Sequence, residues 1–268
     1  MKTKSHPLLG IHSVVMMIFI YVPILFIVAY SFNSSRLAAD WSGFTFDWYV
    51  SLFDNRHVME ALANSLTVAI VSTVISTVLG TLAALAMRKI GRRLKSGMGG
   101  LLYLPIIIPD IIMGLSLLVL FNQLNMPLGK MTIIIAHITF SLSYVYVVVS
   151  TRLSGMGGQL EEAAQDLGAS SWQTFRHVTL PQIAPGIISG ALIAFTLSLD
   201  DFMVSFFVSG PNSTTLPIYI YGQVKRGISP EINALCTILI LVTVTLIFLA
   251  QFALNRGKGQ KKQSVLPF

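Results

Sequence analysis

Long apolar runs dominate this chain and recur along its whole length. Because the hydrocarbon core of a bilayer is about 30 Å thick, a spanning helix needs roughly 20 mostly apolar residues. Six stretches meet that requirement, near residues 11–32, 64–87, 101–121, 132–150, 185–208 and 232–254. The first is longer than the apolar part of a signal peptide, and five more follow it. The pattern predicts one all-α integral membrane domain, residues 1–268, with about six transmembrane helices.

Composition supports a lipid environment. Of the 268 residues, 54% are hydrophobic and 11% are charged, whereas a soluble domain has roughly 25% charged residues. The net charge is +7, but the basic residues form short clusters between apolar runs, which indicates membrane orientation and no nucleic-acid partner. The single cysteine, Cys236, excludes an internal disulfide and a paired-cysteine metal site.

The positions of Lys and Arg predict the orientation. Cytoplasmic loops of membrane proteins are enriched in both residues. With the N-terminus in the cytoplasm, 13 of the 18 Lys and Arg lie in cytoplasmic segments. Six spans return the chain to the side on which it began, so we expect both termini in the cytoplasm. The basic segment 256–262 then meets anionic lipid headgroups.

One cytoplasmic loop, residues 151–184, is unusually long and polar, and loops of that length are often functional. Residues 160–167 are good helix formers, and Gly168 suits the left-handed end of a helix. Ser170 and Gln173 have the spacing of a capping box. We expect two short helices that bend at Gly168, with prolines closing the segment before the fifth span.

The loop also carries a spaced motif: Glu162-Ala163-Ala164, three residues, Gly168, nine residues, Val178, one residue and Leu180-Pro181. It resembles the cytoplasmic EAA loop of the transmembrane subunits of bacterial ABC importers, with Val178 where Ile is usual. The resemblance implies a type I ABC importer permease fold and a coupling helix that docks on an ATP-hydrolysing subunit. The coupling residues that it implies are Glu161, Glu162, Ala163, Ala164, Gly168, Leu180 and Pro181. An amphipathic hairpin on the headgroups is the alternative.

Three acidic residues lie inside the predicted spans, where charge is costly and usually functional. Asp110 follows Pro109 in the third span, and Asp200 and Asp201 lie in the fifth. No Lys or Arg lies within a predicted span, so a cationic cargo fits these acids best, and polyamine amines suit an acidic pair. Asp110 is equally compatible with helix capping. Adjacent helical residues point about 100° apart, so either one of the pair faces the pathway or the helix breaks there.

Aromatic faces attract cations, and four aromatic residues near these acids are candidates for the same pathway. They are Phe195, Phe202, Tyr144 and Tyr146. Ordinary packing or lipid contact is the alternative for each of them. His137 has no second metal-ligating residue at a suitable spacing, so we expect it to bond between helices and expect no metal site.

Further stretches resemble the spermidine/putrescine importer permeases over about residues 21–241, and the second permease subunit most. They include Ser31-Phe32-Asn33-Ser34-Ser35, Pro109-Asp110, Phe195-Thr196-Leu197-Ser198-Leu199-Asp200-Asp201 and Val208-Ser209-Gly210-Pro211. The resemblance implies a polyamine importer in a bacterial inner membrane. Its partners would be a second homologous permease subunit, an ATP-binding subunit dimer that carries ATP–Mg and an external polyamine-binding protein.

Several other functions fit less well. The chain has no Walker motif, no nucleophile elbow and no HExxH, so we expect neither ATP hydrolysis nor other catalysis by it, and no bound cofactor. An ABC importer of the same kind with another cargo (an opine, thiamine, iron or an anion) is the alternative. An anion importer, however, would be expected to carry Lys or Arg in its pathway. A stand-alone secondary transporter would leave the spacing from Glu162 to Pro181 unexplained.

Overall fold

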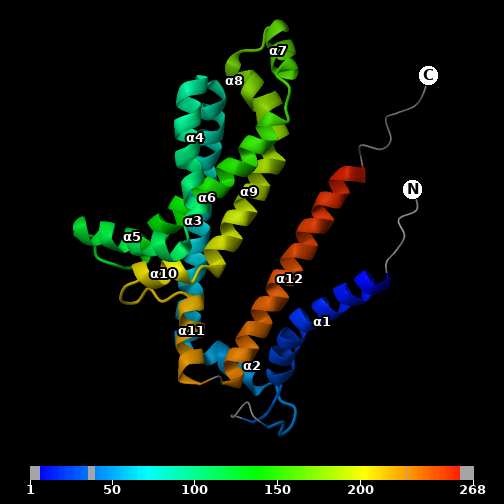
Figure 1. Cartoon of the computed structure of the whole chain (residues 1–268), viewed down its shortest axis with the longest axis vertical. Coiled ribbons are helices and arrows are strands. Elements are labelled where there is room, and N and C mark those ends of the chain that lie inside the picture. The colour runs from blue at the N-terminus through cyan, green and yellow to red at the C-terminus, as the bar shows by residue number, and fades with distance from the viewer. Residues whose placement is uncertain (1–6, 36–39, 228, 260–268) are drawn as a thin grey trace. The chain divides into compact units, whose positions relative to one another are not determined.

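The computed structural model describes residues 7–35, 40–227 and 229–259, and its regular elements there are helices (Figure 1). They are α1 (Pro7–Tyr30), α2 (Asp47–Asp54), α3 (Arg56–Lys89), α4 (Arg92–Ile107), α5 (Asp110–Gln123), α6 (Lys130–Ser154), α7 (Gln159–Asp166), α8 (Ser171–Thr174), a π-helical turn η1 (Phe175–Thr179), α9 (Leu180–Asp200), α10 (Met203–Val208), α11 (Leu216–Arg226) and α12 (Pro230–Gly259). The chain forms two compact units: unit 1 comprises Met1–Arg56 and Ile220–Phe268, and unit 2 comprises His57–Tyr219.

Helix α6 is the centre of unit 2, where it packs along α9 and against α3 and α4 (Figure 1). Two apolar clusters share it. One joins α6 to α3, α5 and α10 around Val68, Phe121 and Ile133. The other joins α6 to α3 and α9 around Val145, Val149 and Ile183.

Close helix packing around α6 depends on glycine. A Cβ on Gly80 of α3 would lie 2.8 Å from the Cβ of Val145 and 2.9 Å from the carbonyl oxygen of Leu142. On the α9 side, a Cβ on Gly190 would lie 3.3 Å from the Cα of Val145. Association of helices in lipid relies on van der Waals contact, which small residues permit by letting the backbones approach closely.

In the described residues, four helical segments are long and apolar enough to cross a membrane: Gly10–Tyr30, Arg56–Lys89, Lys130–Ser154 and Ser171–Asp200. A fifth span results if the bent pair Gly97–Ile107 and Asp110–Gln123 is taken as one. The predicted span 232–254 falls in α12, whose described apolar part is Pro230–Thr245. The side chains beyond residue 245 lie outside the description.

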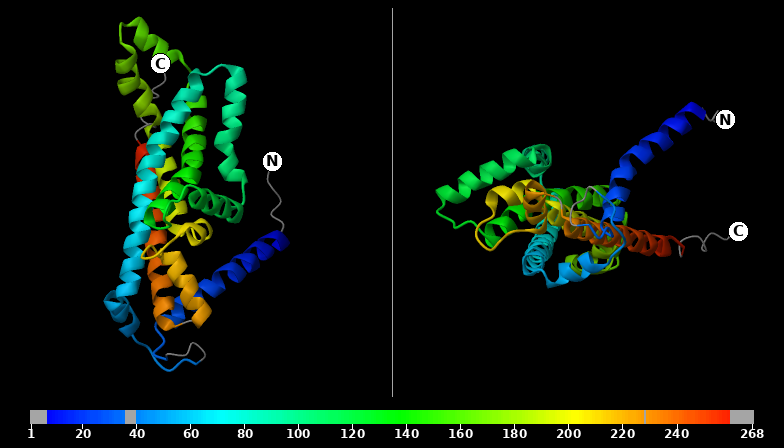
Figure 2. Two further views of the ribbon diagram at one scale, coloured as in Figure 1. Left: turned by 90° about the vertical axis from the view of Figure 1, so that its left-hand side faces the viewer. Right: turned by 90° about the horizontal axis from the view of Figure 1, so that it is seen from below.

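The predicted span 101–121 is sharply bent, with an angle of 107° between α4 and α5 at residues 108–109 (Figure 2). Ile108 adopts an extended conformation with ψ 128°. A residue before proline avoids the helical region because the proline ring clashes with it. Pro109 then precedes the first turn of α5, where its missing N–H costs nothing.

The predicted span 185–208 is also broken, since α9 ends at Asp200 and α10 starts at Met203. Asp201 is extended, with ψ 122°. Its carboxylate accepts hydrogen bonds from the backbone N–H groups of Val204 and Ser205, at 3.2 and 2.7 Å. A side chain that binds these amides replaces the carbonyls of a continuing helix, so the Asp201 carboxylate stabilises the start of α10.

The long loop contains α7 and α8, and it turns at Gly168, where φ is +88°. The capping box is present: the Gln173 N–H donates to Ser170 Oγ, and the Ser170 N–H donates to Gln173 Oε1. The expectation that Pro181 and Pro185 close the loop is wrong, because helix runs through both from Ser171 to Asp200. Pro181 has no N–H for the carbonyl of His177, and the wider turn η1 just before it accommodates this defect.

Unit 1 joins α1, α2 and α12. The Trp48 indole N–H donates to the Asn33 carbonyl at 2.7 Å, and Ser31 and Tyr49 share a hydrogen bond. Asn55 donates to Glu231 at the start of α12. The side chains of Gly10–Tyr30 in α1 are largely exposed within the chain, although most are apolar, which fits contact with lipid or with another subunit.

Replacing Gly80 with alanine should destabilise the protein, because the new methyl group collides with Val145 and Leu142. Overpacking of this kind costs about 1–3 kcal/mol. The melting temperature of the purified protein in detergent measures the effect. Gly100→Ala is the matched control, since no heavy atom lies within 4 Å of a Cβ there and alanine favours a helix more than glycine does. Equal losses in both variants would contradict the packing argument.

Candidate functional site

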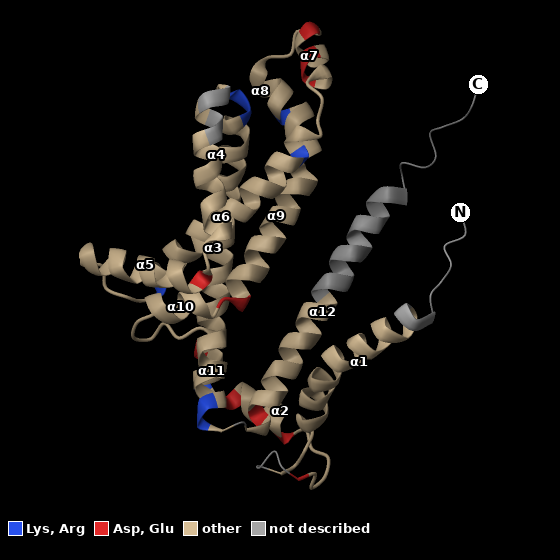
Figure 3. Cartoon of the chain, in the orientation of Figure 1, with Lys and Arg blue, Asp and Glu red and all other residues tan. Residues whose placement is uncertain are grey.

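The two helix breaks of unit 2 meet at one cavity. Its volume is about 360 Å³, and it is lined by Pro105, Asp110, Phe140, Tyr144, Leu197, Asp200, Asp201, Phe202 and Met203. Acidic residues mark the ribbon at the start of α5 and at the α9–α10 junction (Figure 3). All three acids predicted from the sequence therefore line the same space. In transporters, discontinuous helices of this kind are typical of substrate and ion sites.

Two of these carboxylates are exposed and have no hydrogen-bond or ion-pair partner in the described part of the chain. Asp110 occupies the first position of α5. Asp200 is the last residue of α9, where the partial negative charge of a helix C-terminus disfavours an anion. The N-terminus of α5 favours the charge of Asp110, whereas Asp200 has no such compensation within the protein. A cation in the cavity would meet both carboxylates.

Asp201 differs from these two acids. Its side chain is only 9% exposed. Its oxygens accept the two amides at the start of α10, and Oδ2 lies 3.3 Å from His137 Nε2. Two backbone amides and an imidazole nitrogen therefore surround this carboxylate. The sequence could not show which of the adjacent acids faces the cavity, and the helix break separates their roles.

His137 is the centre of a buried polar network. Its Nδ1 lies 2.6 Å from Ser198 Oγ of α9, and its Nε2 lies 2.9 Å from Ser205 Oγ of α10. Ser198 in turn shares a hydrogen bond of 3.0 Å with Ser72 of α3. His137 thus bonds between helices, as its isolated position in the sequence suggests. Nothing in the sequence singled out these serines, because membrane helices commonly contain serine.

The four aromatic candidates separate into two groups. Tyr144 and Phe202 line the acidic cavity. Tyr146 lies elsewhere, edge-on to Tyr103 at 5.9 Å between ring centroids, beside another cavity. Phe195 is half-buried on α9 and is not part of the cavity wall. Phe140 and Met203 also line the cavity, and the sequence offered no sign of either.

At the other end of α6, Glu161 fastens the long loop to unit 2. Its Oε1 accepts hydrogen bonds from Arg88 Nη1 of α3 at 2.8 Å and from Thr179 Oγ1 at 2.6 Å. Burial opposes ionisation of Glu161, but the hydrogen bonds from Thr179 and Arg88 outweigh it, so the pKa of Glu161 is lowered. Glu161 therefore holds α7 against both α3 and the turn before α9.

The other residues of the motif face outward. Glu162 and Ala163 are exposed on α7, and Leu180 and Pro181 are exposed at the start of α9, while Ala164 is half-buried. Leu167 is 90% exposed and Trp172 is 67% exposed. The loop thus presents acidic and apolar side chains together, which is the mixture expected of a protein-binding surface.

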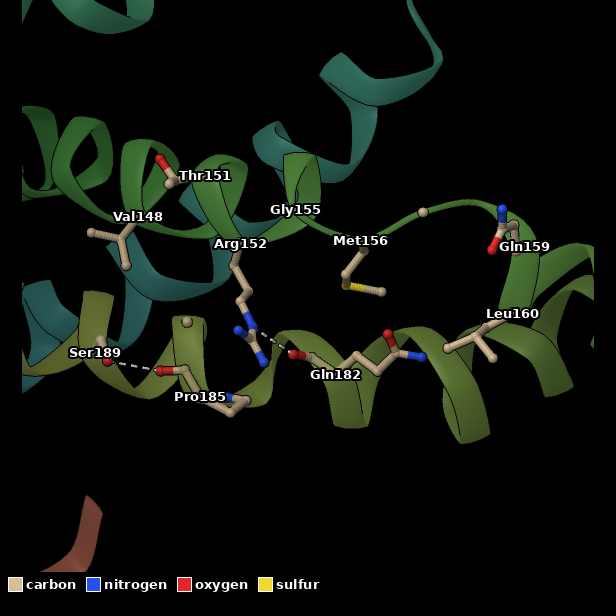
Figure 4. A pocket seen from close by; sticks show the side chains of 12 residues that line it. Val148, Thr151, Arg152, Gly155, Met156, Gln159, Leu160, Gln182, Pro185 and Ser189 are labelled. Carbon is tan, nitrogen blue, oxygen red and sulfur yellow. Dashed lines mark hydrogen bonds between the residues drawn. The ribbon is translucent and has the colours of Figure 1, made fainter. Parts of the chain in front are cut away.

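A larger cavity, of about 670 Å³, lies between the ends of α6, α7 and α9 (Figure 4). Arg152 projects across it, and its Nε donates to the Gln182 carbonyl at 3.1 Å. This bond ties the end of α6 to the start of α9. In the described residues, no three His, Cys, Asp or Glu side chains are grouped to hold a metal ion.

Comparisons with known proteins agree with this geometry. Residues 76–259 match the family of binding-protein-dependent transport system inner membrane components. The chain is 42% identical to the putrescine transport system permease protein PotI of Escherichia coli K12, over 92% of this chain and 90% of the relative. It is also 42% identical to the spermidine/putrescine transport system permease protein PotC of the same strain, over 90% and 92%.

Solved structures share the fold. One is a bacterial ABC transporter involved in the import of the acidic polysaccharide alginate, with a TM-score of 0.74 at 22% identity over 94% of both chains. Another is a bacterial alginate ABC transporter in complex with a periplasmic protein that carries an alginate pentasaccharide, with a TM-score of 0.71 at 21% identity over 97% of this chain and 96% of the other. The chain belongs to the binding-protein-dependent transport system inner membrane components, as a non-catalytic permease subunit with the type I ABC importer fold.

Proposed function

We propose that this permease subunit imports polyamines, with putrescine and spermidine as the expected cargo. The observation that carries the proposal is the cavity where the unpaired carboxylates of Asp110 and Asp200 meet the aromatic side chains of Tyr144 and Phe202. No Lys or Arg lines it among the described residues. Ammonium groups pair with carboxylates, and aromatic faces add cation–π attraction. The names of the two permease relatives support the same cargo.

The subunit would work within a larger assembly. We propose a second, homologous permease subunit beside it, because an importer of this fold passes its cargo between two such chains. An external binding protein would deliver the polyamine, and the related transporter solved with a periplasmic protein supports this arrangement. ATP–Mg would bind on a pair of ATPase subunits, and this chain would need no cofactor. The distribution of Lys and Arg supports cytoplasmic termini.

The long loop would couple these ATPase subunits to the membrane helices. Glu161 fixes α7 to α3 and η1, so a force on α7 reaches both helices as a rigid-body movement. Glu162, Ala163 and Leu167 are exposed and would form the docking face. A helical run from Ser171 to Asp200 links this face to the edge of the acidic cavity, which provides a continuous path from ATPase to cargo.

Saturable, ATP-dependent uptake of labelled putrescine tests the cargo. Asp110→Asn and Asp200→Asn should each reduce uptake at least tenfold, because each removes one charge partner of the ammonium, and tenfold corresponds to about 1.4 kcal/mol. Asp54→Asn is the matched control, since Asp54 is exposed on α2, outside the cavity. Uptake of thiamine or an anion by a wild-type transporter that ignores both polyamines would contradict the proposal.

Glu162→Ala should leave the subunit folded but uncouple it, because its carboxylate is exposed and has no hydrogen bond or ion pair within the described part of the chain. We expect cargo-stimulated ATP hydrolysis of the assembled transporter to fall severalfold. Asp166→Asn on the same helix is the control for loss of negative charge. If that control loses as much activity, the docking role of Glu162 is wrong.

Coupling should also fail at acidic pH. The pKa of Glu161 is below its ordinary value of 4.5. The stabilisation that its carboxylate gives to the attachment of α7 is therefore complete above pH 4.5, and it is lost as the pH falls through the lowered pKa. In a variant with Trp41→Phe and Trp48→Phe, Trp172 is the sole tryptophan, and its fluorescence reports the loosening of the loop as the pH falls. Glu161→Gln should abolish this transition, and an unchanged transition would show that another group causes it.

A further inference from the structure

A hydrogen-bonded chain links four helices of unit 2 to the acidic cavity. It runs from Ser72 through Ser198 and His137 to Ser205 and Asp201. His137 is 1% exposed, and the three serines are at most 4% exposed. A buried polar group without a partner costs free energy, so such a chain has a preferred arrangement of protons.

The Asp201 carboxylate selects the tautomer of His137, because its Oδ2 lies 3.3 Å from Nε2 and calls for a donor there. The Nε2–H group donates toward Asp201 Oδ2 and Ser205 Oγ, which lie 3.3 and 2.9 Å away. Nδ1 then accepts the hydroxyl proton of Ser198 at 2.6 Å. The Ser198 oxygen stays open to the hydroxyl of Ser72. An imidazole N–H therefore faces the Asp201 carboxylate.

Asp201 consequently has its donors within the protein. Two come from the first turn of α10, and the third comes from His137. Backbone amides at a helix start and a neighbouring imidazole balance a carboxylate charge. Asp110 and Asp200 line the same cavity without any such partner in the described residues.

We propose that His137 is a positioning residue of the cargo site: it holds Asp201 as the cap of α10, so that Asp110 and Asp200 are the carboxylates that meet the cargo. This rests on the proposed import of a cationic cargo. In this arrangement Asp201 sets where α9 stops and α10 begins, and that break places Asp200 at the cavity. A histidine that merely joined α6 to α9 would act through Ser198 alone.

Two substitutions of His137 separate these roles. The amide nitrogen of glutamine reaches the place of Nε2, so His137→Gln keeps a donor for Asp201 and loses the bond to Ser198. The shorter asparagine reaches the place of Nδ1, so His137→Asn keeps the bond to Ser198 and loses Asp201. We expect the Gln variant to retain at least half of the putrescine uptake rate and the Asn variant less than a tenth. Equal uptake, or better uptake by the Asn variant, would overturn the proposal.

Ser141→Ala is the control for a polar change in the core of α6. Ser141 lies one turn beyond His137, and its hydroxyl is buried without a partner among the described residues. Its uptake should match that of the wild type. Yield and elution of each assembled transporter on size exclusion show whether a loss reflects misfolding. If the Gln variant does not assemble, the thiol-modification measurement below, which needs no uptake, tests whether Asp201 is held away from the cargo.

A second measurement needs no cargo. In a Cys236→Ser background, Met203→Cys places a thiol in the cavity wall, where Met203 is 44% exposed. The rate of modification by a cationic methanethiosulfonate, divided by that of a neutral one, reports the local negative charge. Asp200→Asn should lower this ratio about threefold, the effect of one charge several ångströms away in water, and Asp201→Asn should lower it less.

The outcomes distinguish the two proposals. If Asp201→Asn lowers the ratio as much as Asp200→Asn does, Asp201 is a cavity charge and the positioning role is wrong. If the ratios follow expectation while no polyamine enters, the assignment of cargo fails and the division of roles between the two acids stands.

Discussion

Backbone amides and carbonyls inside a bilayer must find partners within the protein, because lipid offers none. Unit 2 nevertheless interrupts two helices, α4–α5 and α9–α10, and the breaks border one cavity. Each break deals in its own way with the backbone groups that it leaves without partners. Proline removes a donor at the first break, and the Asp201 carboxylate takes up two amides at the second. The rest of the site depends on these solutions, because they bring helix ends and acids to the same place.

The surroundings of the breaks hold them in position. Glycine contacts bring α3 and α9 close to α6. This close approach allows Ser198 of α9 to reach His137, and Ser72 of α3 to reach Ser198. Hydrogen bonds between membrane helices contribute modestly on their own. Here they act together with packing, so the polar chain fixes the register of the helices that carry the acids.

In the coupling loop, one of two neighbouring acids is held by bonds within the protein and the other is exposed. Glu161 faces inward and binds Arg88 and Thr179, while the neighbouring Glu162 faces outward. Asp201 and Asp200 repeat the pattern at the cavity. In both pairs one acid builds the local structure and its neighbour remains available to a partner. Neighbouring residues on a helix or at its end point in different directions, which makes this division of roles geometrically natural.

Hydropathy, charge distribution and residue spacing alone determined the membrane class, the helical fold and the loop with its bend at Gly168, and the resemblance of the loop motif indicated the family. These features depend on local composition and periodicity, which a sequence displays directly. The tertiary structure decided which acids share a cavity, that Tyr146 and Phe195 lie outside it, and that helix continues through Pro181 and Pro185. It also decided the roles of His137, Ser198 and Ser205. Their roles arise from contacts between helices 61 and 68 residues apart in the chain, and no local pattern encodes which buried polar groups will meet across a helix interface.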